Sequence, residues 1–374
     1  MSDAHDTQLM RRLLAAAPGT AALDAEDAGT VMRFLTAYLA VTGWGGRLTG
    51  TARMQERPIA VLVDALRQAG ARITYLHNDG FPPLELAGFA AAAAAQSPTA
   101  LAVRGDISSQ YISALLMVGP RLPGGLRLRL TGPVGSRPYI DMTVALMQRF
   151  GANCAAEDDC LLVAAGAYQP TNYTVEADWS AASYWYAMVA LGPPGSEIGL
   201  PGLRRQSLQG DQAIAGIMKH FGVETTFLPD GIHLRQQPMP ANSEVATVDF
   251  TNCPDLAQTV AVVAAALARP VDMTGLASLR IKETDRITAL QAELAKFGGE
   301  LREIAAGRFR AESTGFAVAS QAVATYHDHR MALAFAPLAL RGPLVIEAPT
   351  VVKKSYPQFW TELARRGFVI SEAG

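Results

Sequence analysis

The sequence repeats a helix-ending pattern at an interval of about 75 residues. At five places a segment with apolar residues at helical spacing runs into a glycine, and a short extended segment follows. A second set of helical patterns, near 109–118, 181–191, 255–268 and 329–341, lies between them and lacks the glycine. The glycines are Gly70, Gly151, Gly222, Gly298 and Gly367. Each interval has room for two helices and several short strands, so we interpret the chain as a repeated α/β unit.

Length and composition set the broad class. A chain of 374 residues exceeds one typical core, so two domains are expected. Hydrophobic residues make up 49% and charged residues 18%, as in a globular protein. The net charge of −2 gives no overall electrostatic attraction to nucleic acid or to an anionic membrane. Three cysteines without metal-binding spacing fit a reducing cytoplasm, and the acidic N-terminus is no signal peptide. We expect a cytoplasmic monomer without metal or cofactor.

The most charged stretch, residues 279–287, lies directly before a helical pattern. Lys282, Glu283 and Arg286 gather there, and Thr284 or Asp285 can cap the helix. The N-terminus of a helix carries free amides and partial positive charge, which favours anions. The stretch is interpreted as an anion site with an acid beside it, against the alternative of an ordinary capped helix with solvated charges.

Several other helical patterns begin with polar residues of the same kind. Each alone is more typical of a helix cap than of a binding site. Because most helices in both halves begin this way, the sequence predicts a cleft where several helix N-termini converge. The residues at these starts include Gly29, Arg57, Ser108, Ser109, Gln110, Ser136, Asp255 and Arg330.

The motifs at these helix starts resemble the 5-enolpyruvylshikimate-3-phosphate synthase family over essentially the whole chain. The resemblance implies an α/β, two-domain enolpyruvyl transferase fold of repeated βαβαββ units, with helix N-termini aimed into the interdomain cleft. Domain two is expected over 1–176, with its first unit incomplete, and domain one over 177–374. The matching segments are Arg53-Met54-Gln55-Glu56-Arg57-Pro58, Ser108-Ser109-Gln110, Ser136-Arg137-Pro138-Tyr139-Ile140-Asp141, Ser207-Leu208-Gln209-Gly210-Asp211, Lys282-Glu283-Thr284-Asp285-Arg286 and Asp328-His329-Arg330-Met331-Ala332.

The resemblance implies transfer of the enolpyruvyl group of phosphoenolpyruvate to the 5-hydroxyl of shikimate 3-phosphate, with release of phosphate. This reaction belongs to the shikimate pathway, which leads to chorismate and the aromatic amino acids. Both substrates are anions, so each needs several cationic or amide partners. No metal or organic cofactor is implied.

The resemblance also assigns roles to individual residues. Asp255 is the expected base at the 5-hydroxyl, assisted by Lys282, and Glu283 delivers and recovers the methylene proton. The expected contacts of shikimate 3-phosphate are Ser108, Ser109, Ser136 and Tyr139, with Gln110 near both substrates. The expected contacts of phosphoenolpyruvate are Arg286 and Arg330 at its carboxylate, and Arg57, Lys354 and the amides near Gly29 at its phosphate.

The sequence departs from the family pattern at its start. The family's N-terminal strand and a Lys-Ser-x-x-x-Arg helix have no counterpart, so we expect either a longer natural chain or a weakened enzyme. Glu26-Asp27 replaces a Gly-Asn pair, and Ser278 stands where asparagine is common. Two alternatives stay open: a ligand-binding remnant, and a UDP-N-acetylglucosamine enolpyruvyl transferase. The second usually carries a reactive cysteine, whereas residues 1–153 contain none.

Overall fold

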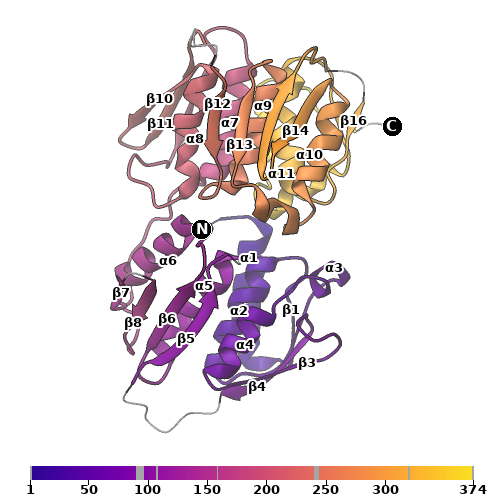
Figure 1. Ribbon diagram of the computed structural model, residues 1–374. Coiled ribbons are helices and arrows are strands. Elements are labelled where there is room, and N and C mark those ends of the chain that lie inside the picture. Colours follow the sequence, from indigo (N-terminus) through magenta and orange to yellow (C-terminus); the bar gives the residue numbers. More distant parts are fainter. Residues whose placement is uncertain are drawn as a thin grey trace. The chain divides into compact units, whose positions relative to one another are not determined.

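The computed structural model describes residues 2–89, 97–106, 108–157, 159–239, 244–318 and 321–372. The chain divides into two compact units, Met1–Thr174 (unit 1) and Val175–Gly374 (unit 2) (Figure 1). The division falls two residues before the boundary expected from the sequence. Each unit has its own cluster of buried apolar side chains. No helix within the described ranges is long and apolar enough to cross a membrane.

Unit 1 contains two sheets of the same design. In each, the first and second strands pair in parallel, and the fourth strand pairs antiparallel with both the second and the third. The strand orders are therefore β1-β2-β4-β3 and β5-β6-β8-β7. The strands are β1 (Ala22–Asp24), β2 (Gly45–Thr49), β3 (Ala71–Tyr75), β4 (Leu84–Phe89), β5 (Thr99–Arg104), β6 (Leu126–Thr131), β7 (Cys154–Glu157) and β8 (Cys160–Val163).

Unit 2 repeats this design once in full, in the sheet of order β12-β13-β15-β14. The three-stranded sheet of order β10-β11-β9 has only the antiparallel pairs of this design, and β16-β17 has only the parallel pair. The strands are β9 (Glu197–Pro201), β10 (Val223–Leu228), β11 (Gly231–Gln236), β12 (Ala246–Asp249), β13 (Val271–Thr274), β14 (Gly299–Ala305), β15 (Arg308–Ser313), β16 (Ala322–Val323) and β17 (Val345–Ile346). The predicted α/β architecture of repeated βαβαββ units is confirmed.

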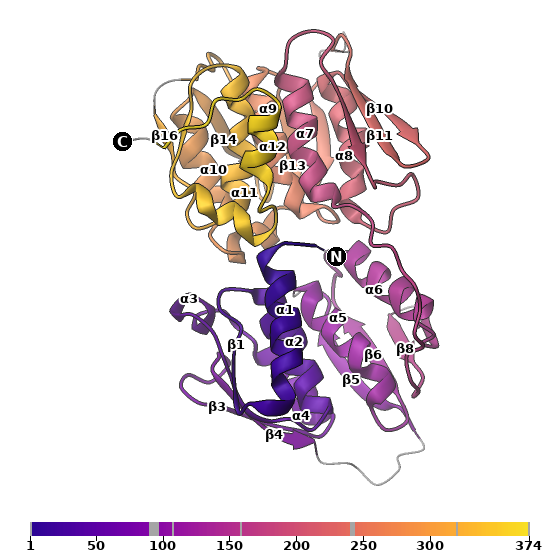
Figure 2. The same cartoon turned by 180° about the vertical axis from the view of Figure 1, so that it is seen from behind.

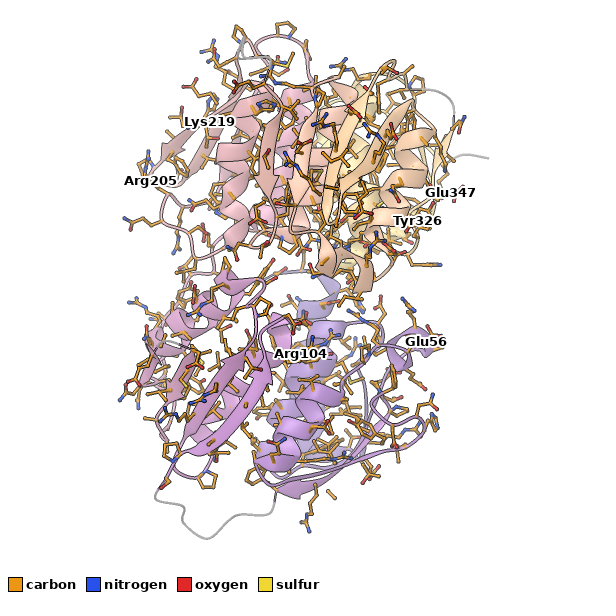
Figure 3. All side chains as sticks on the ribbon, in the orientation of Figure 1. Glu56, Arg104, Arg205, Lys219, Tyr326 and Glu347 are labelled. Carbon is orange, nitrogen blue, oxygen red and sulfur yellow. The ribbon has the colours of Figure 1, made fainter. Side chains whose placement is uncertain are left out.

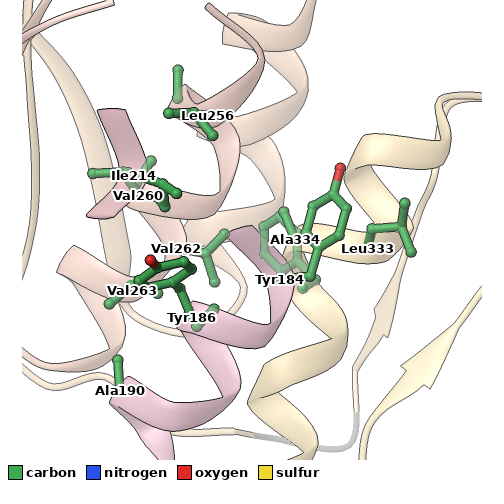
Figure 4. Packing of buried hydrophobic residues seen from close by; sticks show 14 of the residues in the cluster. Tyr184, Tyr186, Ala190, Ile214, Leu256, Val260, Val262, Val263, Leu333 and Ala334 are labelled. Atoms are coloured by element: carbon green, nitrogen blue, oxygen red, sulfur yellow. The ribbon is translucent and has the colours of Figure 1, made fainter. Parts of the chain in front are cut away.

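The two sets of helical patterns in the sequence correspond to two kinds of position. The helical patterns between the five glycines form inner helices, which are apolar on most sides because other elements cover them. Every residue of α9 is buried, and so is every residue of α7 except Ala181. Figure 4 shows side chains of α7, α9 and α11 packed together. The inner helices are α2 (Gly29–Val41), α5 (Ser109–Val118), α7 (Trp179–Leu191), α9 (Ala257–Ala266) and α11 (His329–Phe335).

The set with a terminal glycine forms outer helices that bury one face. All five glycines adopt the predicted positive φ, between 75° at Gly222 and 112° at Gly70. The outer helices are α4 (Ala60–Gln68), α6 (Arg137–Arg149), α8 (Ile214–Ile217) with the 3₁₀ turn η4 (Met218–Phe221), α10 (Arg286–Ala295) and α12 (Phe359–Arg365). Two further helices, α1 (His5–Ala16) and α3 (Ala52–Gln55), lie in unit 1. Seen from behind, unit 2 presents α11 and α12 (Figure 2).

Candidate active site

The predicted site residues follow the carboxyl ends of the parallel strands. Parallel strands end at the same edge of a sheet, so the segments that leave them gather there. In unit 2 these segments are the 3₁₀ turn η5 (Pro254–Leu256) after β12, the start of α10 after β13, the start of α11 after β16, and the 3₁₀ turn η8 (Pro349–Lys354) after β17. The shared edge of the sheet β12-β13-β15-β14 explains why Asp255 and Arg286 meet. The segments after β16 and β17 belong to a second sheet, and the packing of α9 against α10 and α11 brings the two sets together.

Arg286 is the centre of the cluster in unit 2. It is the first residue of α10, and its guanidinium is only 2% exposed. It donates to three carboxylates: Nε to Asp328 Oδ2 at 2.7 Å, Nη1 to Asp255 Oδ1 at 2.9 Å, and Nη2 to Glu283 Oε2 at 2.9 Å. Asp285, not Thr284, caps α10 by accepting from the amides of Ile287 and Thr288. A buried charge needs such partners to offset its desolvation.

Arg330 holds the second oxygen of Asp255. It lies in the first turn of α11, where Asp328 caps the helix by accepting from the Arg330 amide at 2.8 Å. Its Nη2 donates to Asp255 Oδ2 at 2.9 Å, and its Nη1 lies 3.3 Å from the Tyr184 hydroxyl on α7. The carboxylate of Asp255 is therefore clamped between two guanidiniums, one on each oxygen. Asp255 belongs to η5, whereas the sequence placed it at the start of the α-helix.

Glu283, Lys354 and Lys282 complete this cluster. Lys354 Nζ, at the end of η8, lies 3.5 Å from Glu283 Oε1 while Arg286 holds Oε2. Lys282 lies directly after the 3₁₀ turn η6 (Ala277–Ile281), and the charges of Asp255, Arg286 and Glu283 act on it. All six site residues predicted in unit 2 are thus brought together.

The proton affinities in this cluster follow from burial and charge. Burial acts to raise the pKa of Asp255, but the charges of Arg330, Lys282 and Arg286 outweigh it and hold that pKa below its usual range. Burial lowers the pKa of Lys282. A carboxylate with a depressed pKa is a weak base, so Asp255 can take a proton readily only when its guanidinium partners are drawn away.

Two further buried groups in unit 2 were not predicted as site residues. Asp211 accepts a hydrogen bond from Ser180 on α7, and burial, followed by the charge of Asp255, raises the pKa of Asp211 to about 7. His329 is buried beside Arg330, and burial lowers its pKa to about 4, which keeps the ring neutral. Tyr184 was also missed, because it lies inside an apolar helix and is close to Arg330 only in the fold.

In unit 1 the starts of α2 and α5 meet. Gln110, on the first turn of α5, donates from Nε2 to Thr30 Oγ1 at 2.9 Å and accepts at Oε1 from Arg33 Nη1 at 2.8 Å. Arg33 lies in α2 and is only 7% exposed. Arg33 was not among the residues predicted from the sequence. The signal was available, since it is the only charged residue in the otherwise apolar segment 29–41.

Gly29 and Arg57 meet at the same place. A Cβ atom built on Gly29 would lie 2.5 Å from Arg33 Nη1 and 2.7 Å from Arg57 Nη1. Two guanidiniums therefore approach the first residue of α2, where only glycine leaves room for them. Arg57 itself lies three residues before α4 begins at Ala60, so it is on the connecting segment and not on the helix.

The four residues predicted to contact shikimate 3-phosphate also lie at helix starts in unit 1. Ser108 caps α5 by accepting from the Gln110 amide at 3.4 Å, and Ser109 is the first residue of that helix. Ser136 precedes α6 with a left-handed φ of 53°, and Tyr139 lies in its first turn. Helices α5 and α6 contact each other through Ser113 Oγ and Thr143 Oγ1 at 2.8 Å.

A recess elsewhere in unit 2 is separate from these clusters. It has a volume of ≈ 340 Å³ beside β10, and its lining includes Arg205, Lys219 and Phe227. Figure 3 shows Arg205 and Lys219 at the outer edge of the unit. Among the described residues no group of histidine, cysteine or carboxylate side chains is arranged to hold a metal ion.

Solved structures with a similar fold are enolpyruvyl transferases. EPSP synthase from Acinetobacter baumannii superposes with a TM-score of 0.72, at 24% identity, over 93% of this chain and 79% of the other. The enolpyruvyl transferase NikO from Streptomyces tendae superposes with a TM-score of 0.63, at 15% identity, over 89% and 75%. At these identities the likeness concerns the fold alone, and it agrees with the repeated α/β design.

Sequence relatives give the family. A 3-phosphoshikimate 1-carboxyvinyltransferase from Bacteroides fragilis is 46% identical over 99% of this chain and 88% of its own length. One from Methanospirillum hungatei is 37% identical over 92% of this chain and 78% of its own length. The family model for EPSP synthase matches residues 5–363. This chain therefore belongs to the EPSP synthase (3-phosphoshikimate 1-carboxyvinyltransferase) family.

Proposed function

We propose that this chain transfers the enolpyruvyl group of phosphoenolpyruvate to the 5-hydroxyl of shikimate 3-phosphate and releases phosphate. One observation carries the proposal beyond family membership. Arg286 and Arg330, from the starts of two different helices, each hold one oxygen of the same carboxylate, that of Asp255. Two guanidiniums placed around one carboxylate also fit the carboxylate of phosphoenolpyruvate, because the fork of an arginine matches that group.

The phosphate of phosphoenolpyruvate needs a separate set of donors. Arg57 and the first amides of α2 at Gly29 fit this role, since a helix N-terminus and a guanidinium both favour a phosphate oxygen. Lys354 supplies a further cation that Glu283 holds in this structure. Gln110 is bonded to α2 and lies at the start of α5, so its amide fits a contact with either substrate.

Shikimate 3-phosphate is assigned to the starts of α5 and α6. Ser108, Ser109 and Ser136 offer hydroxyls and helix amides to its phosphate, and Tyr139 lies one turn into α6. These four assignments rest on the family motif and on the position of each residue at a helix start.

The proposed proton path uses Asp255 and Glu283. Asp255, assisted by Lys282, takes the proton of the 5-hydroxyl while the oxygen bonds to the second carbon of phosphoenolpyruvate. Glu283 gives a proton to the methylene carbon, which becomes a methyl group. In the second half Glu283 takes a proton back from that methyl group, the bond to the phosphate oxygen breaks, and phosphate leaves with the proton held by Asp255.

The ion pairs suggest how substrate activates the base. When the carboxylate of phosphoenolpyruvate takes over Arg286 and Arg330, Asp255 loses the two charges that depress its pKa. Lys354 moving to the phosphate removes a cation from Glu283 in the same way. Binding of phosphoenolpyruvate thereby draws the cations away from Asp255 and Glu283, so that these carboxylates can accept a proton.

The direct test is product formation. The chain, incubated with both substrates, is expected to release one phosphate per enolpyruvyl ether formed, as followed by phosphorus NMR. Calorimetry with shikimate 3-phosphate distinguishes an enzyme from a ligand-binding remnant, because a remnant would bind this substrate and show no turnover. An active chain that accepts UDP-N-acetylglucosamine and not shikimate 3-phosphate would overturn the proposal.

A further inference from the structure

Arg33 is a buried cation that the proposed reaction leaves without a role. Its Nη1 donates to Gln110 Oε1, while its Nε is buried and has no hydrogen-bond partner among the residues that the structure describes. No described carboxylate forms an ion pair with it, in contrast to Arg286, which has three. Burying a charge without a counter-charge is costly, so a side chain of this kind is expected to serve a ligand or a neighbouring ligand-binding group.

The contacts of Arg33 fix the direction of every hydrogen bond around Gln110. A guanidinium can only donate, so the amide oxygen of Gln110 must face Arg33 and its NH₂ group must face Thr30. Thr30 Oγ1 accepts that bond, so the proton of its own hydroxyl must point elsewhere. The hydrogen atoms that stay unpaired in the described part of the chain, one N–H of Gln110 and the O–H of Thr30, can therefore be donated to a ligand.

The surrounding structure holds Arg33 in this orientation. Its guanidinium carbon lies 5.3 Å from the centre of the Tyr111 ring, which suits a cation against an aromatic face. The Tyr111 hydroxyl in turn donates to the carbonyl oxygen of Pro58, next to Arg57. The same contacts that orient Arg33 thus also fix the segment that carries the second guanidinium beside Gly29.

We propose that Arg33 is a positioning residue that locks the Gln110 amide, so that Gln110 and Thr30 can each offer a hydrogen-bond donor at the start of α2. The group that this arrangement takes is a fully ionised phosphate, whose oxygens all accept. The proposal rests on the proposed function in naming that phosphate as the one of phosphoenolpyruvate. It adds that Gln110 and Thr30 select the phosphate by donating to it, and that Arg33 acts by orienting Gln110.

The sharpest test is Gln110→Glu. A carboxylate at this position pairs with Arg33 and neutralises the buried charge, so the melting temperature should rise. The same carboxylate cannot donate to Thr30 or to a phosphate, so affinity for phosphoenolpyruvate should fall at least about tenfold. Affinity is measured from the protection that phosphoenolpyruvate alone gives against thermal unfolding, which requires no turnover. Unchanged affinity, or affinity and stability falling together, would overturn the positioning role.

A matched control is Gln148→Glu on α6. Gln148 donates to the carbonyl oxygen of Cys154 at 2.8 Å, and no hydrogen bond joins its side chain to an arginine within the described residues. This change should lower the melting temperature, because it removes a donor, and should leave affinity for phosphoenolpyruvate within about twofold. A general effect of added negative charge in unit 1 would instead weaken binding in both variants.

A double-mutant cycle shows whether Arg33 acts through Gln110. Arg33→Met and Gln110→Ala should each weaken phosphoenolpyruvate about tenfold, and the double variant should lose little more than either one. Arg33→Lys keeps the charge and should restore part of the affinity, and it serves if Arg33→Met does not fold. Additive losses would overturn the proposal even in an active enzyme. Preserved coupling in a chain without turnover would overturn the proposed reaction and leave the positioning role intact.

Discussion

Arg286 and Arg330 of unit 2 and Arg33 of unit 1 are largely buried cations that are held in opposite ways. In unit 2, Arg286 and Arg330 are fully engaged with protein carboxylates, and Asp255 joins them. In unit 1, Arg33 is also buried, but its hydrogen bond goes to the neutral amide of Gln110. The two regions lie at corresponding edges of sheets built on the same repeated design, so the difference lies in the side chains and not in the backbone.

The comparison shows two ways to prepare a site for an anion. Where carboxylates neutralise the cations, a ligand must displace a protein group, and the displaced group is then free to act chemically. Where no carboxylate is present, the ligand adds the missing counter-charge and displaces nothing. The first arrangement suits the chemical step, and the second suits recognition of a phosphate.

The largest effect is expected for Asp255→Asn, which removes the proposed base of unit 2 and retains the shape of the side chain. Turnover should fall by a factor of roughly 10²–10⁴, because the 5-hydroxyl proton has lost its acceptor. Single-turnover assays beside thermal melts measure this. If Asp255 serves only to neutralise Arg286 and Arg330, the melting temperature will change while turnover per folded molecule will not.

Arg330→Ala should weaken phosphoenolpyruvate much more than shikimate 3-phosphate. Loss of one bidentate charge-assisted contact costs on the order of 2–4 kcal/mol, and Arg330 is assigned to the donor carboxylate alone. Calorimetry with each substrate measures the difference. Lys219→Ala, which removes an exposed cation at the recess beside β10, is the matched control and should leave both affinities unchanged. Equal losses for the two substrates would contradict the assignment.

Gly29→Ala tests the crowding of guanidiniums in unit 1. The added methyl would lie 2.5 Å from Arg33 Nη1 and 2.7 Å from Arg57 Nη1, so both side chains must shift. Affinity for phosphoenolpyruvate should fall about tenfold, since a small displacement of a binding group costs that much. Gly216→Ala on α8, where a Cβ meets nothing within 4 Å, is the control and should stabilise its helix. Unchanged affinity in Gly29→Ala would remove Gly29 from the phosphate site.

The smallest effect concerns Asp211 and appears as a pH dependence of stability. Its pKa is raised to about 7 in the folded chain, so the folded state holds a proton that the unfolded state has released. Stability should therefore fall as pH rises towards about 7. The fall runs from about pH 4, where the unfolded chain releases this proton, to about pH 7, so Asp211→Asn should flatten it in melts between about pH 4.5 and 7.5. His329 acts in the opposite direction: its pKa is lowered to about 4, so its contribution reduces stability as pH falls from about 6.5 towards 4.

Much of the fold was predictable because each repeat leaves a recognisable pattern of apolar residues and glycines in the sequence. A glycine is needed where an outer helix ends in a left-handed residue, and Gly70, Gly151, Gly222, Gly298 and Gly367 all show that conformation. Inner helices are apolar all round, which separates the two sets. Helix limits were less accurate: the pattern over 255–268 begins as a 3₁₀ turn, and α9 covers only Ala257–Ala266.

The candidate site was predictable as a set of residues but not as a set of contacts. Charges at helix starts are visible in the chain, and the family motifs select which of them matter. Arg33 was missed because one arginine inside an apolar helix resembles a side chain that reaches to solvent, and only its burial against Gln110 and Tyr111 shows otherwise. Asp211 was quoted within a motif, yet its raised pKa depends on burial that no motif contains.

The sequence by itself determined the repeated α/β unit, the division into two halves and the chemical groups at the helix starts, because these depend on local spacing and on residue type. The tertiary structure decided which charge meets which. Arg286 pairs with Asp255 and Asp328, which lie 31 and 42 residues away, and Arg330 reaches Asp255 across 75 residues. Several acids were equally available as partners. Only the gathering of strand ends and the packing of α9 against α10 and α11 select among them, and burial then sets what each pair does to a proton.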